Sequence, residues 1–426
     1  MKKKYFLAGI ASGIAILLIF QLIFVGVAGA RNFITSFGSI ETAVVEESSK
    51  PIESDKETSV VESESLEFDN PKYNSFDDKV EDVLDTLDDN YLEGIDSEAL
   101  YEEAIRGLVD SVGDPYTTYF TKSEYDSFLE KMEGSYEGIG VVVSYGETED
   151  SIIVVAPFKE SPGEIAGMKP GDEIIGVDQV DVVGMSLDKV VERIKGEKGT
   201  EVVLTVLRGE GEDEVELDIP IIRDVIEIPT IEYELMDGNI GYIGMSGFDI
   251  ITEEQFTNAL DELEIQGQEG LIIDLRNNPG GYLHIVYAIV DELIEKGKLV
   301  VYTEDRNGNR EELITETRDS FDKPLVVLIN GNSASASEIL SGAIKDHERG
   351  VLVGETTFGK GLVQRTFNLD DGSAVKITIS KYYTPDGYYI HGVGIEPDFI
   401  VEYDPESETD NQLDEAIKII TEMINE

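Results

Sequence analysis

Cysteine is absent from this 426-residue sequence, and histidine is scarce. Without cysteine the chain cannot form disulfides, thiolate metal sites or a cysteine nucleophile. The three histidines are His284, His347 and His391, and none belongs to an H-E-x-x-H pattern. We therefore expect no histidine-rich zinc site and predict neither a metal nor a cofactor.

Basic residues are also few. The chain has 33 Lys and Arg against 89 Asp and Glu, which gives a formal net charge of −56 at pH 7. This balance argues against nucleic-acid binding, because a phosphate backbone needs Lys and Arg to displace its counterions. Adsorption on anionic lipid is disfavoured for the same reason, so any membrane contact has to come from a hydrophobic segment.

The N-terminus contains such a segment. Three lysines at positions 2–4 precede an apolar run over residues 5–30, and the first acidic residue is Glu41. The run is long enough to span a bilayer, and its basic end is expected in the cytoplasm. We expect residues 1–30 to be an uncleaved, single-pass membrane anchor with the other domains on the extracytoplasmic side of the cell membrane. A cleaved signal peptide is the alternative, because Ala28-Gly29-Ala30 resembles a cleavage site.

The chain is too long for a single hydrophobic core, and its composition changes along the sequence. Residues 31–72 are rich in Asp, Glu, Ser, Thr and Pro, which predicts an acidic disordered linker. We expect an N-terminal helical domain, a small β domain, a larger α/β core and a C-terminal helix to follow. Their predicted bounds are residues 73–135, 136–222, 223–403 and 404–426.

Apolar residues at helical spacing predict three helices within residues 73–135. Ser97 is expected to cap the second helix, and Thr121 with Glu124 is expected to form a capping box on the third. We interpret this part as a packing or dimerisation element and expect a homodimer. The first helix is expected to bury one stripe, which consists of Phe76, Val80, Val83, Leu84, Leu87 and Tyr91.

From residue 136 onward, short β runs occur together with helices. In residues 136–222 a single prominent helix, Leu187–Ile194, follows several strands, which is typical of a small β domain. From residue 229 strands and helices alternate, which indicates a largely parallel or mixed sheet. We expect the hairpin of Val363–Phe367 and Ala374–Tyr383 to be added to that sheet. The other predicted strands are Gly140–Tyr145, Ile152–Ala156, Glu173–Val177, Val202–Leu207, Ile240–Met245, Leu271–Leu275, Leu325–Ile329 and Val351–Gly354, and the other helices are Glu253–Leu263, Leu283–Ile294, Glu338–Asp346 and Leu413–Ile424.

Ser335 lies in a run of small residues between an apolar strand and an apolar helix. A serine at such a turn presents its hydroxyl near the free N–H groups of the helix, which can stabilise developing negative charge. A serine before a helix is otherwise a simple N-cap. The run alone leaves both roles open.

A serine nucleophile needs a base, and the candidate is Lys360 in the loop Phe358-Gly359-Lys360-Gly361. In an α/β sheet this loop and the serine loop would open at the same carboxyl edge. A lysine can act as base where an apolar setting lowers its pKa from about 10.4. Gln364 could hold the amine by a hydrogen bond. A solvated loop lysine is the alternative.

A third segment, Asp274-Leu275-Arg276-Asn277-Asn278-Pro279-Gly280-Gly281, follows a predicted strand. Its two glycines can direct backbone N–H groups at a ligand, as an oxyanion hole requires, or can merely turn the chain. For the charged residues Asp274, Arg276 and Asp346 we expect structural roles.

Seven motifs in order along residues 75–426 resemble those of the carboxyl-terminal processing peptidase family. Members of that family are serine endopeptidases with a PDZ domain and a crotonase-like core. Together with the membrane helix and the helical segment predicted above, the resemblance gives a multidomain α+β and α/β protein with a PDZ-like β domain and a crotonase-like α/β protease core. The motifs are Gly113-Asp114-Pro115-Tyr116, Gly138-Ile139-Gly140, Lys169-Pro170-Gly171-Asp172, Asp274-Leu275-Arg276-Asn277-Asn278, Ser333-Ala334-Ser335-Ala336-Ser337-Glu338, Phe358-Gly359-Lys360-Gly361 and Gly394-Ile395-Glu396-Pro397-Asp398.

The resemblance also implies catalytic roles. Ser335, the middle serine of the S-A-S-A-S run, would be the nucleophile, and Lys360 would be the general base. Gln364 maps to a glutamine that assists the lysine. The oxyanion donors would be the N–H groups of Ala336 and of one glycine in the N-N-x-G-G turn, for which we choose Gly281.

The block after residue 136 resembles a PDZ peptide-binding groove between the strand Val141–Tyr145 and the helix Leu187–Ile194. The resemblance implies that protein substrates with free C-termini bind there by strand addition. We expect Val190, Val191 and Ile194 to form the wall of this groove. The expected peptide-binding residues are Gly138, Ile139, Gly140 and Val141.

The leading hypothesis is a serine endopeptidase that cleaves exported or membrane-associated proteins. The alternative is a catalytically silent PDZ receptor on a crotonase-like scaffold, and the joint presence of Ser335, Lys360 and Gln364 argues against it. A third hypothesis is acyl-thioester chemistry on the same scaffold. That chemistry would need a carboxylate base and a nucleotide pocket, and the sequence indicates neither.

Overall fold

The part of the chain that can be described begins at residue 75. The predicted anchor and linker lie outside it. Within it, no helix is both long enough and apolar enough to cross a membrane. The computed structural model describes residues 75–146, 151–209, 211, 214–317 and 320–426.

Three helices begin the described chain: α2 (Phe76–Asn90), α3 (Ser97–Asp110) and α4 (Lys122–Glu133). The expected burial of the stripe on α2 is wrong, because no residue of α2 is buried. Val83 and Tyr91 are 49% and 54% exposed. Helical spacing identifies the residues that share a face, but it does not identify what covers that face.

The ends of these helices are fixed by side-chain caps. Asp96, not Ser97, caps α3, and its carboxylate accepts the N–H of Glu98 at 3.1 Å. Aspartate and serine are both good N-caps, so two neighbouring candidates could not be separated by sequence. The predicted capping box of Thr121 and Glu124 on α4 is confirmed.

The small β domain is a sheet of six antiparallel strands with the helix α6 (Leu187–Ile194). The four predicted strands and the predicted helix are confirmed. The strand order is β3-β4-β5-β7-β8, with β6 paired to β5, so β3 lies at an edge of the sheet. The elements are β3 (Val141–Tyr145), β4 (Ile152–Pro157), α5 (Pro162–Ala166), β5 (Glu173–Val177), β6 (Val180–Asp181), β7 (Glu201–Arg208) and β8 (Val215–Ile222).

Two residues of α6 pack into the core of this domain. Val190 and Ile194 are almost completely buried, in one cluster with residues of β4, β5 and β7. The expectation that they form the wall of a groove is wrong, because residues four apart share the helix face that packs on the sheet. Val191, which is half-buried, does not belong to that buried cluster.

The chain enters and leaves this β domain side by side. β2 (Ser135–Gly138) pairs antiparallel with β9 (Asp224–Glu227). The two segments that connect the domain to the rest of the chain are therefore hydrogen-bonded to each other.

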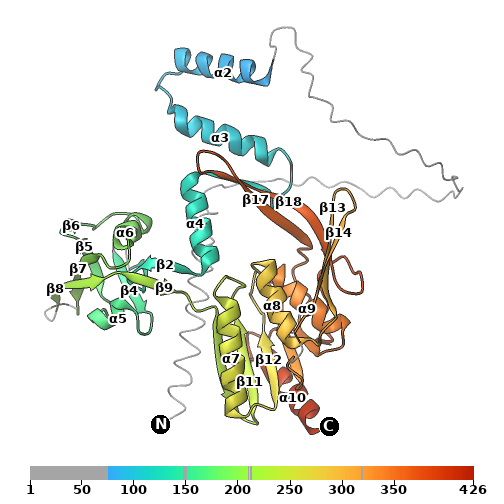
Figure 1. Cartoon of the computed structure of the whole chain (residues 1–426). Helices are drawn as coiled ribbons and strands as arrows, with labels where there is room; N and C mark the ends of the chain where they lie inside the picture. The colour runs from blue at the N-terminus through green and yellow to red at the C-terminus, as the bar shows by residue number, and fades with distance from the viewer. Residues whose placement is uncertain (1–74, 147–150, 210, 212–213, 318–319) are drawn as a thin grey trace, which may run out of the picture. The chain divides into compact units, whose positions relative to one another are not determined.

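A second sheet forms the α/β core, and Figure 1 shows its strands β11 and β12 beside the helices α7 and α8. Its order is β10-β11-β12-β15-β16-β19, and all neighbours are parallel except β10 and β11. The predicted alternation of strands and helices is confirmed. The strands are β10 (Ile231–Met236), β11 (Ile240–Met245), β12 (Gly270–Asp274), β15 (Leu325–Ile329), β16 (Val351–Gly354) and β19 (Phe399–Ile400).

Both faces of this core sheet are covered by helices. In β12, Leu271 and Ile273 pack with α7, α8 and α9, whereas Ile272 packs with α10. This explains why the central strands are continuously apolar instead of alternating. The helices are α7 (Thr252–Gln266), α8 (Leu283–Leu293), α9 (Ala336–Asp346) and α10 (Asn411–Asn425).

The predicted hairpin of β17 (Leu362–Asn368) and β18 (Ala374–Tyr383) is confirmed, but it does not extend the core sheet. It belongs to a separate five-stranded sheet with β1 (Thr118–Phe120), β13 (Leu299–Asp305) and β14 (Arg310–Ile314). Local sequence specifies the turn and the alternation of a hairpin. It does not specify which distant strands pair with its edges.

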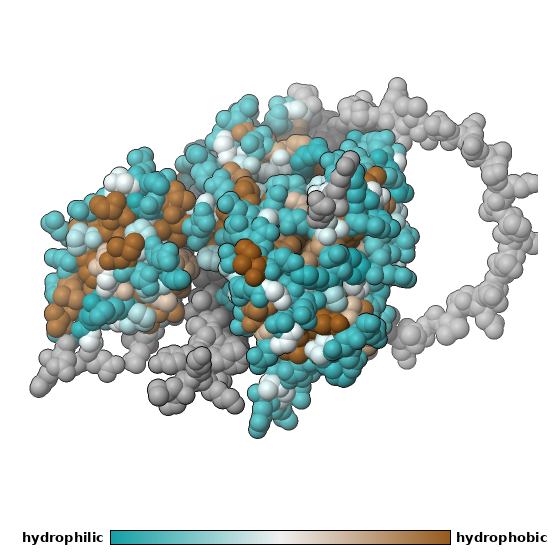
Figure 2. Space-filling view, turned by 60° about the horizontal axis from the view of Figure 1, so that its bottom comes forward, coloured by the Kyte–Doolittle hydropathy of each residue, from teal (hydrophilic) through white to brown (hydrophobic). Residues whose placement is uncertain are grey.

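The surface agrees with the acidic composition. Figure 2 shows one face of the molecule, on which hydrophilic residues dominate and apolar residues form separate patches.

Candidate active site

Three loops that the sequence singled out follow adjacent parallel strands. They come after β12, β15 and β16, which are neighbours in the core sheet. The carboxyl ends of parallel strands share one edge, and that edge is where sites form in α/β sheets. The Gly-Gly turn, the serine run and the lysine loop are thereby brought together.

The three serines of the S-A-S-A-S run have different surroundings. Ser333 is fully buried and donates a hydrogen bond to the carbonyl of Leu275 at 2.8 Å. Ser337 is also fully buried and donates to the carbonyl of Asn278 at 2.9 Å. Ser335 is half-buried, and its hydroxyl donates to no buried carbonyl among the described residues but interacts with the phenol of Tyr382. Ser335 is therefore the serine whose hydroxyl does not hold a backbone carbonyl in place.

The backbone of Ser335 has an unusual conformation, with φ 56° and ψ −110°. A positive φ is disfavoured for a residue with a side chain, and such residues occur often at functional sites. The conformation is held by the N–H of Ser335, which donates to the carboxylate of Glu338 at 2.8 Å.

Glu338 is the residue that the sequence interpretation missed, because it was read only as part of a motif. Its carboxylate is fully buried and also accepts the N–H groups of Gly359 at 2.7 Å and Lys360 at 2.8 Å. The hydroxyl of Thr357 donates to it at 2.6 Å. The available signal was the S-x-x-E spacing from Ser335, which is typical of a capping box. One carboxylate therefore binds both the serine loop and the lysine loop.

Lys360 is half-buried, and its Nζ lies 4.9 Å from the centre of the Tyr116 ring. Burial lowers the pKa of this lysine, and the nearby Lys376 lowers it further, although Glu338 and Asp114 act in the opposite direction. Among the described residues, Lys360 Nζ forms no ion pair and no hydrogen bond with Ser335 Oγ. The two groups belong to one site but are not in direct contact.

Tyr382 lies beneath both loops. Its hydroxyl is 3.0 Å from the carbonyl oxygen of Ser335 and also contacts that of Lys360, so it can donate to either. Tyr382 is almost completely buried, and burial raises the pKa of its phenol well above the usual value. The phenol therefore remains a hydrogen-bond donor.

Gln364 is not brought to Lys360 by a hydrogen bond. Its side-chain amide donates to the carbonyl of Leu362 at 3.3 Å and to the hydroxyl of Thr378 at 3.4 Å. A hydrogen bond between the Gln364 amide and the Lys360 amine would require the amide to break its hydrogen bonds to Leu362 and Thr378.

The Gly-Gly turn lies against the start of α9. A Cβ on Gly280 would be 2.8 Å from Ser335 Cβ and 2.9 Å from the nitrogen of Ala336, so a side chain is excluded there. The N–H of Gly280 donates to the side chain of Asn278 at 2.9 Å. In contrast, the N–H groups of Gly281 and Ala336 have no acceptor among the described residues. These two donors are the free ones beside the serine.

Asn278 fixes this arrangement. Its side chain accepts from Gly280 and donates to the carbonyl of Met245 at 3.0 Å. Its own carbonyl accepts the N–H of Ala334 at 3.0 Å and the hydroxyl of Ser337. The glycine turn and the serine run are therefore joined through one fully buried asparagine.

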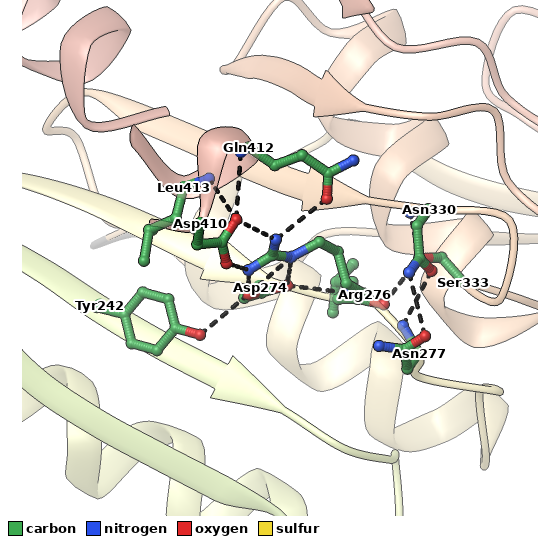
Figure 3. Close-up of polar contacts among 10 residues, drawn as sticks. Tyr242, Asp274, Arg276, Asn277, Asn330, Ser333, Asp410, Gln412 and Leu413 are labelled. Carbon is green, nitrogen blue, oxygen red and sulfur yellow. Dashed lines mark hydrogen bonds and ion pairs between the residues drawn. The ribbon is translucent and has the colours of Figure 1, made fainter. Parts of the chain in front are cut away.

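Figure 3 shows the charged network that supports the base of this turn. The guanidinium of Arg276 donates to Asp274 at 2.6 Å and to Asp410 at 2.7 Å. Asp410 in turn caps α10 by accepting two of its N–H groups, and Tyr242 donates to Asp274 at 3.0 Å. The start of the C-terminal helix is thus bound to the segment that leads to the glycines.

Asp346, the third charge considered in the sequence, has a different partner. Its carboxylate accepts the N–H of Asp386 at 2.8 Å and so holds a surface turn. In the part of the chain that the structure describes, no three His, Asp or Glu side chains converge on a metal position.

In the β domain, the predicted carboxylate loop has glycines where side chains do not fit. Gly140 has a φ of 69°, and a Cβ there would be 2.4 Å from Ser161 Cβ. A Cβ on Gly138 would be 2.8 Å from the ring of Tyr136. The carbonyl of Ile139 accepts the N–H of Gly163 at 2.7 Å. Val141 starts β3, whose outer edge has no partner among the described strands.

These features define a peptidase with a PDZ domain, and the sequence matches that class. Residues 239–401 match peptidase family S41, residues 127–207 match the PDZ domain, and residues 27–124 match the N-terminal domain of the activating protease CtpB.

The chain belongs to the carboxy-terminal processing proteases of family S41. It is 40% identical to carboxy-terminal processing protease CtpA of Bacillus subtilis, over 75% of this chain and 68% of that protein. It is 38% identical to CtpB of the same organism, over 80% and 71% of the two chains. The solved photosystem II D1 C-terminal processing protease is 31% identical and covers 78% of this chain and 88% of its own, with a TM-score of 0.45. The family resemblance noted in the sequence is confirmed.

The different surroundings of the three serines predict different stabilities. Ser333→Ala and Ser337→Ala each remove one of the two hydrogen bonds that a buried carbonyl accepts and should lower the free energy of unfolding by about 0.5–1.5 kcal/mol. Ser335→Ala removes no hydrogen bond to a buried carbonyl and should change it by less than about 0.5 kcal/mol. Denaturant unfolding followed by circular dichroism measures all three, and an equal loss for Ser335→Ala would contradict the prediction.

Proposed function

We propose that this protein is a serine endopeptidase in which Ser335 is the nucleophile and Lys360 the general base. The observation that carries the proposal is the buried carboxylate of Glu338, which accepts the backbone N–H groups of both residues and so fixes the serine and lysine loops relative to each other. The lowered pKa of Lys360, caused mainly by burial, favours the neutral amine that a base needs. The chain belongs to a protease family, so the alternative of a catalytically silent PDZ receptor is not favoured.

In the acylation step, Ser335 Oγ attacks the scissile carbonyl carbon and its proton passes to Lys360 Nζ. The new C–O bond forms while the carbonyl π electrons move to oxygen. The free N–H groups of Ala336 and Gly281 stabilise that oxyanion. Collapse of the intermediate breaks the C–N bond, and the Lys360 ammonium returns the proton to the leaving amine.

In the deacylation step, water replaces the amine. Lys360 takes a proton from the water molecule while the oxygen of that water attacks the ester carbon. The C–O bond to Ser335 then breaks, and the proton goes to Ser335 Oγ. Gln364 assists by holding the amine, which requires its amide to turn away from Thr378. The sum is hydrolysis of one peptide bond by one water.

Substrate selection is proposed for the PDZ domain. Strand addition to the open edge of β3 would place a substrate tail beside Gly138, Ile139, Gly140 and Val141. The positive φ of Gly140 curls the backbone ahead of β3, so that successive amides can face a terminal carboxylate. The substrates are then exported or membrane-associated proteins with free C-termini.

Substitution of the catalytic pair tests the mechanism. With the full-length protein and an unfolded protein substrate, Ser335→Ala should reduce kcat/KM by at least about a thousandfold. Lys360→Arg should be as inactive as Lys360→Ala, because arginine cannot be deprotonated. Ser333→Ala and Ser337→Ala, assayed below their unfolding temperatures, are the controls that should still cut. Cleavage by Ser335→Ala would refute the assignment of the nucleophile.

The pH dependence follows from the same lysine. The protonated amine is inactive, so activity should rise with pH and level off above the pKa of Lys360. Because the pKa is lowered, the midpoint should lie below the ordinary value of 10.5. A rate that falls with increasing pH over this range would be inconsistent with a lysine base.

Tail recognition predicts that a free carboxylate matters. Amidation of the substrate C-terminus removes the charge that the loop amides would bind, which should lower kcat/KM by about 10- to 100-fold. A short peptide that carries the cleavage site without the tail is the control and should be cut equally as acid and amide. Equal cleavage of the long acid and amide substrates would remove the case for tail recognition.

The membrane anchor and the homodimer are also proposals. The apolar run at residues 5–30 motivates the anchor, and two exposed apolar residues, Leu108 in α3 and Val112 just after it, motivate the dimer. If the anchor is present, the full-length protein should resist carbonate extraction. A secreted form that begins at Arg31 would contradict the anchor.

If the protein is a homodimer, it should sediment as a dimer after solubilisation in detergent. A monomer at micromolar concentration would contradict the homodimer.

A further inference from the structure

The motif Gly113-Asp114-Pro115-Tyr116 takes no part in the mechanism described above. Its last three residues form a β-turn with Thr117, whose N–H donates to the carbonyl of Asp114 at 3.2 Å. Proline at the second position presets the backbone of such a turn. The Asp114 carboxylate also accepts the N–H of Tyr116 at 3.1 Å and the hydroxyl of Thr117 at 2.6 Å. The backbone of Tyr116 is therefore fixed.

Two contacts join this turn to β18. The Thr117 hydroxyl accepts the N–H of Thr378 at 3.2 Å, and β1, which follows the turn, pairs antiparallel with β18. The hydroxyl of Thr378 in turn accepts from the Gln364 amide at 3.4 Å. The turn is therefore attached to the strand that also binds the proposed catalytic glutamine.

The ring of Tyr116 lies at the Lys360 amine. Lys360 Nζ is over the ring, 4.9 Å from its centre, which is within the range where a ring face attracts a cation. Among the described residues, this Nζ has neither a hydrogen-bond acceptor nor an ion-pair partner. Because a lysine side chain is flexible, the ring is the contact that can hold the amine in place.

Tyr116 is itself held by a neighbour from another segment. Its ring and the ring of His391 meet edge to face, with centres 6.3 Å apart. A Cβ on Gly361 would be 2.9 Å from the backbone nitrogen of His391, so the segment after β18 lies against the lysine loop. Tyr116 therefore has contacts on both the lysine loop and the segment that packs on it.

Other titratable groups near Lys360 or Tyr116 come from four elements. The two carboxylates among them already accept hydrogen bonds from backbone and hydroxyl groups, and neither forms an ion pair with Lys360. The groups are Asp114 in the turn, Glu338 in α9, Lys376 and Tyr382 in β18, and His391 after β18.

We propose that Tyr116 is a positioning residue for Lys360: its ring face holds Nζ in the site and stabilises the ammonium that forms when Lys360 takes the Ser335 proton. This inference rests on the proposed Ser335–Lys360 mechanism. Burial disfavours the ammonium form and so keeps the amine able to accept a proton. The ring face acts in the opposite direction and lowers the cost of the charge once the proton has been transferred.

The first test compares two substitutions in the full-length protein. Tyr116→Phe keeps the ring face and removes the hydroxyl, whereas Tyr116→Leu keeps an apolar side chain and removes the ring. Tyr101→Leu is the matched control, because Tyr101 is an exposed tyrosine of α3. The readouts are kcat and KM for an unfolded protein substrate across pH, and the pH dependence of Ser335 labelling by a fluorophosphonate, which needs no substrate tail.

For Tyr116→Leu we expect the high-pH plateau of kcat to fall by about 10- to 100-fold, because the amine is no longer held in position. KM should stay within about twofold, since the ring acts on the chemical step. The midpoint of the alkaline rise should move down by about half to one pH unit, because loss of the ring face makes the ammonium easier to deprotonate. Tyr116→Phe and Tyr101→Leu should keep the parental plateau and midpoint.

A second test keeps the shape of the side chain, in case Tyr116→Leu disturbs the fold. Phenylalanines with an increasing number of ring fluorines are placed at position 116, which weakens the negative potential of the ring face. The midpoint of Ser335 labelling should fall stepwise with fluorination. A purely structural role would leave this midpoint unchanged.

Several outcomes overturn the inference. A midpoint that is unchanged or moves up in Tyr116→Leu, or fluorinated rings that behave like phenylalanine, would leave Tyr116 with a packing role only. A loss in Tyr116→Phe equal to that in Tyr116→Leu would assign the effect to the hydroxyl. Ser335→Ala is measured alongside: if it still cleaves, the proposed function fails, whereas an inactive Ser335→Ala with unshifted Tyr116 variants removes only the role of Tyr116.

Discussion

The arrangement of the site depends on one buried carboxylate. Glu338 has no contact with solvent and is satisfied by the N–H groups of Ser335, Gly359 and Lys360 together with the hydroxyl of Thr357. A buried carboxylate that loses its donors is costly. Any displacement of the serine loop relative to the lysine loop would leave Glu338 without donors, so the two loops form one rigid unit although 24 intervening residues separate Ser335 from Lys360.

The glycine turn is fixed in a similar way by neutral and charged groups. Asn278 joins the glycine turn to the serine run. Arg276 binds both Asp274 and Asp410, and the bond to Asp410 joins the segment before the turn to the C-terminal helix. The contacts of Asn278 with Ser337 and of Arg276 with Asp410 each link the segment after β12 to a segment that follows another parallel strand. The positions of the backbone donors in the site therefore depend on the whole core sheet, because no single loop contains all the residues that hold them.

Much of this could be predicted from sequence because it is local. The strands around residues 325–329 and 351–354 were recognisable as short apolar runs, and their order placed Ser335 and Lys360 at one sheet edge. What could not be predicted depends on partners distant in the chain. The sheet that takes up β18, the buried side of α6 and the donors of Glu338 all involve pairings that periodicity does not encode. The contact between Gln364 and Lys360 was expected because Gln364 follows Lys360 by four residues, and the Gln364 side chain instead contacts Leu362 and Thr378.

The unpaired edge of β3 has a consequence for solution behaviour. An exposed strand edge is a template for any extended chain, including the edge of another copy of the same protein. The strand addition proposed for substrate tails would require this edge to stay without a permanent cover. With a net charge of −56, two copies repel each other before their edges can meet, and this repulsion weakens as salt screens it. Acidity thus opposes fibril-like self-association without closing the groove, and it equally disfavours strongly acidic tails at low ionic strength.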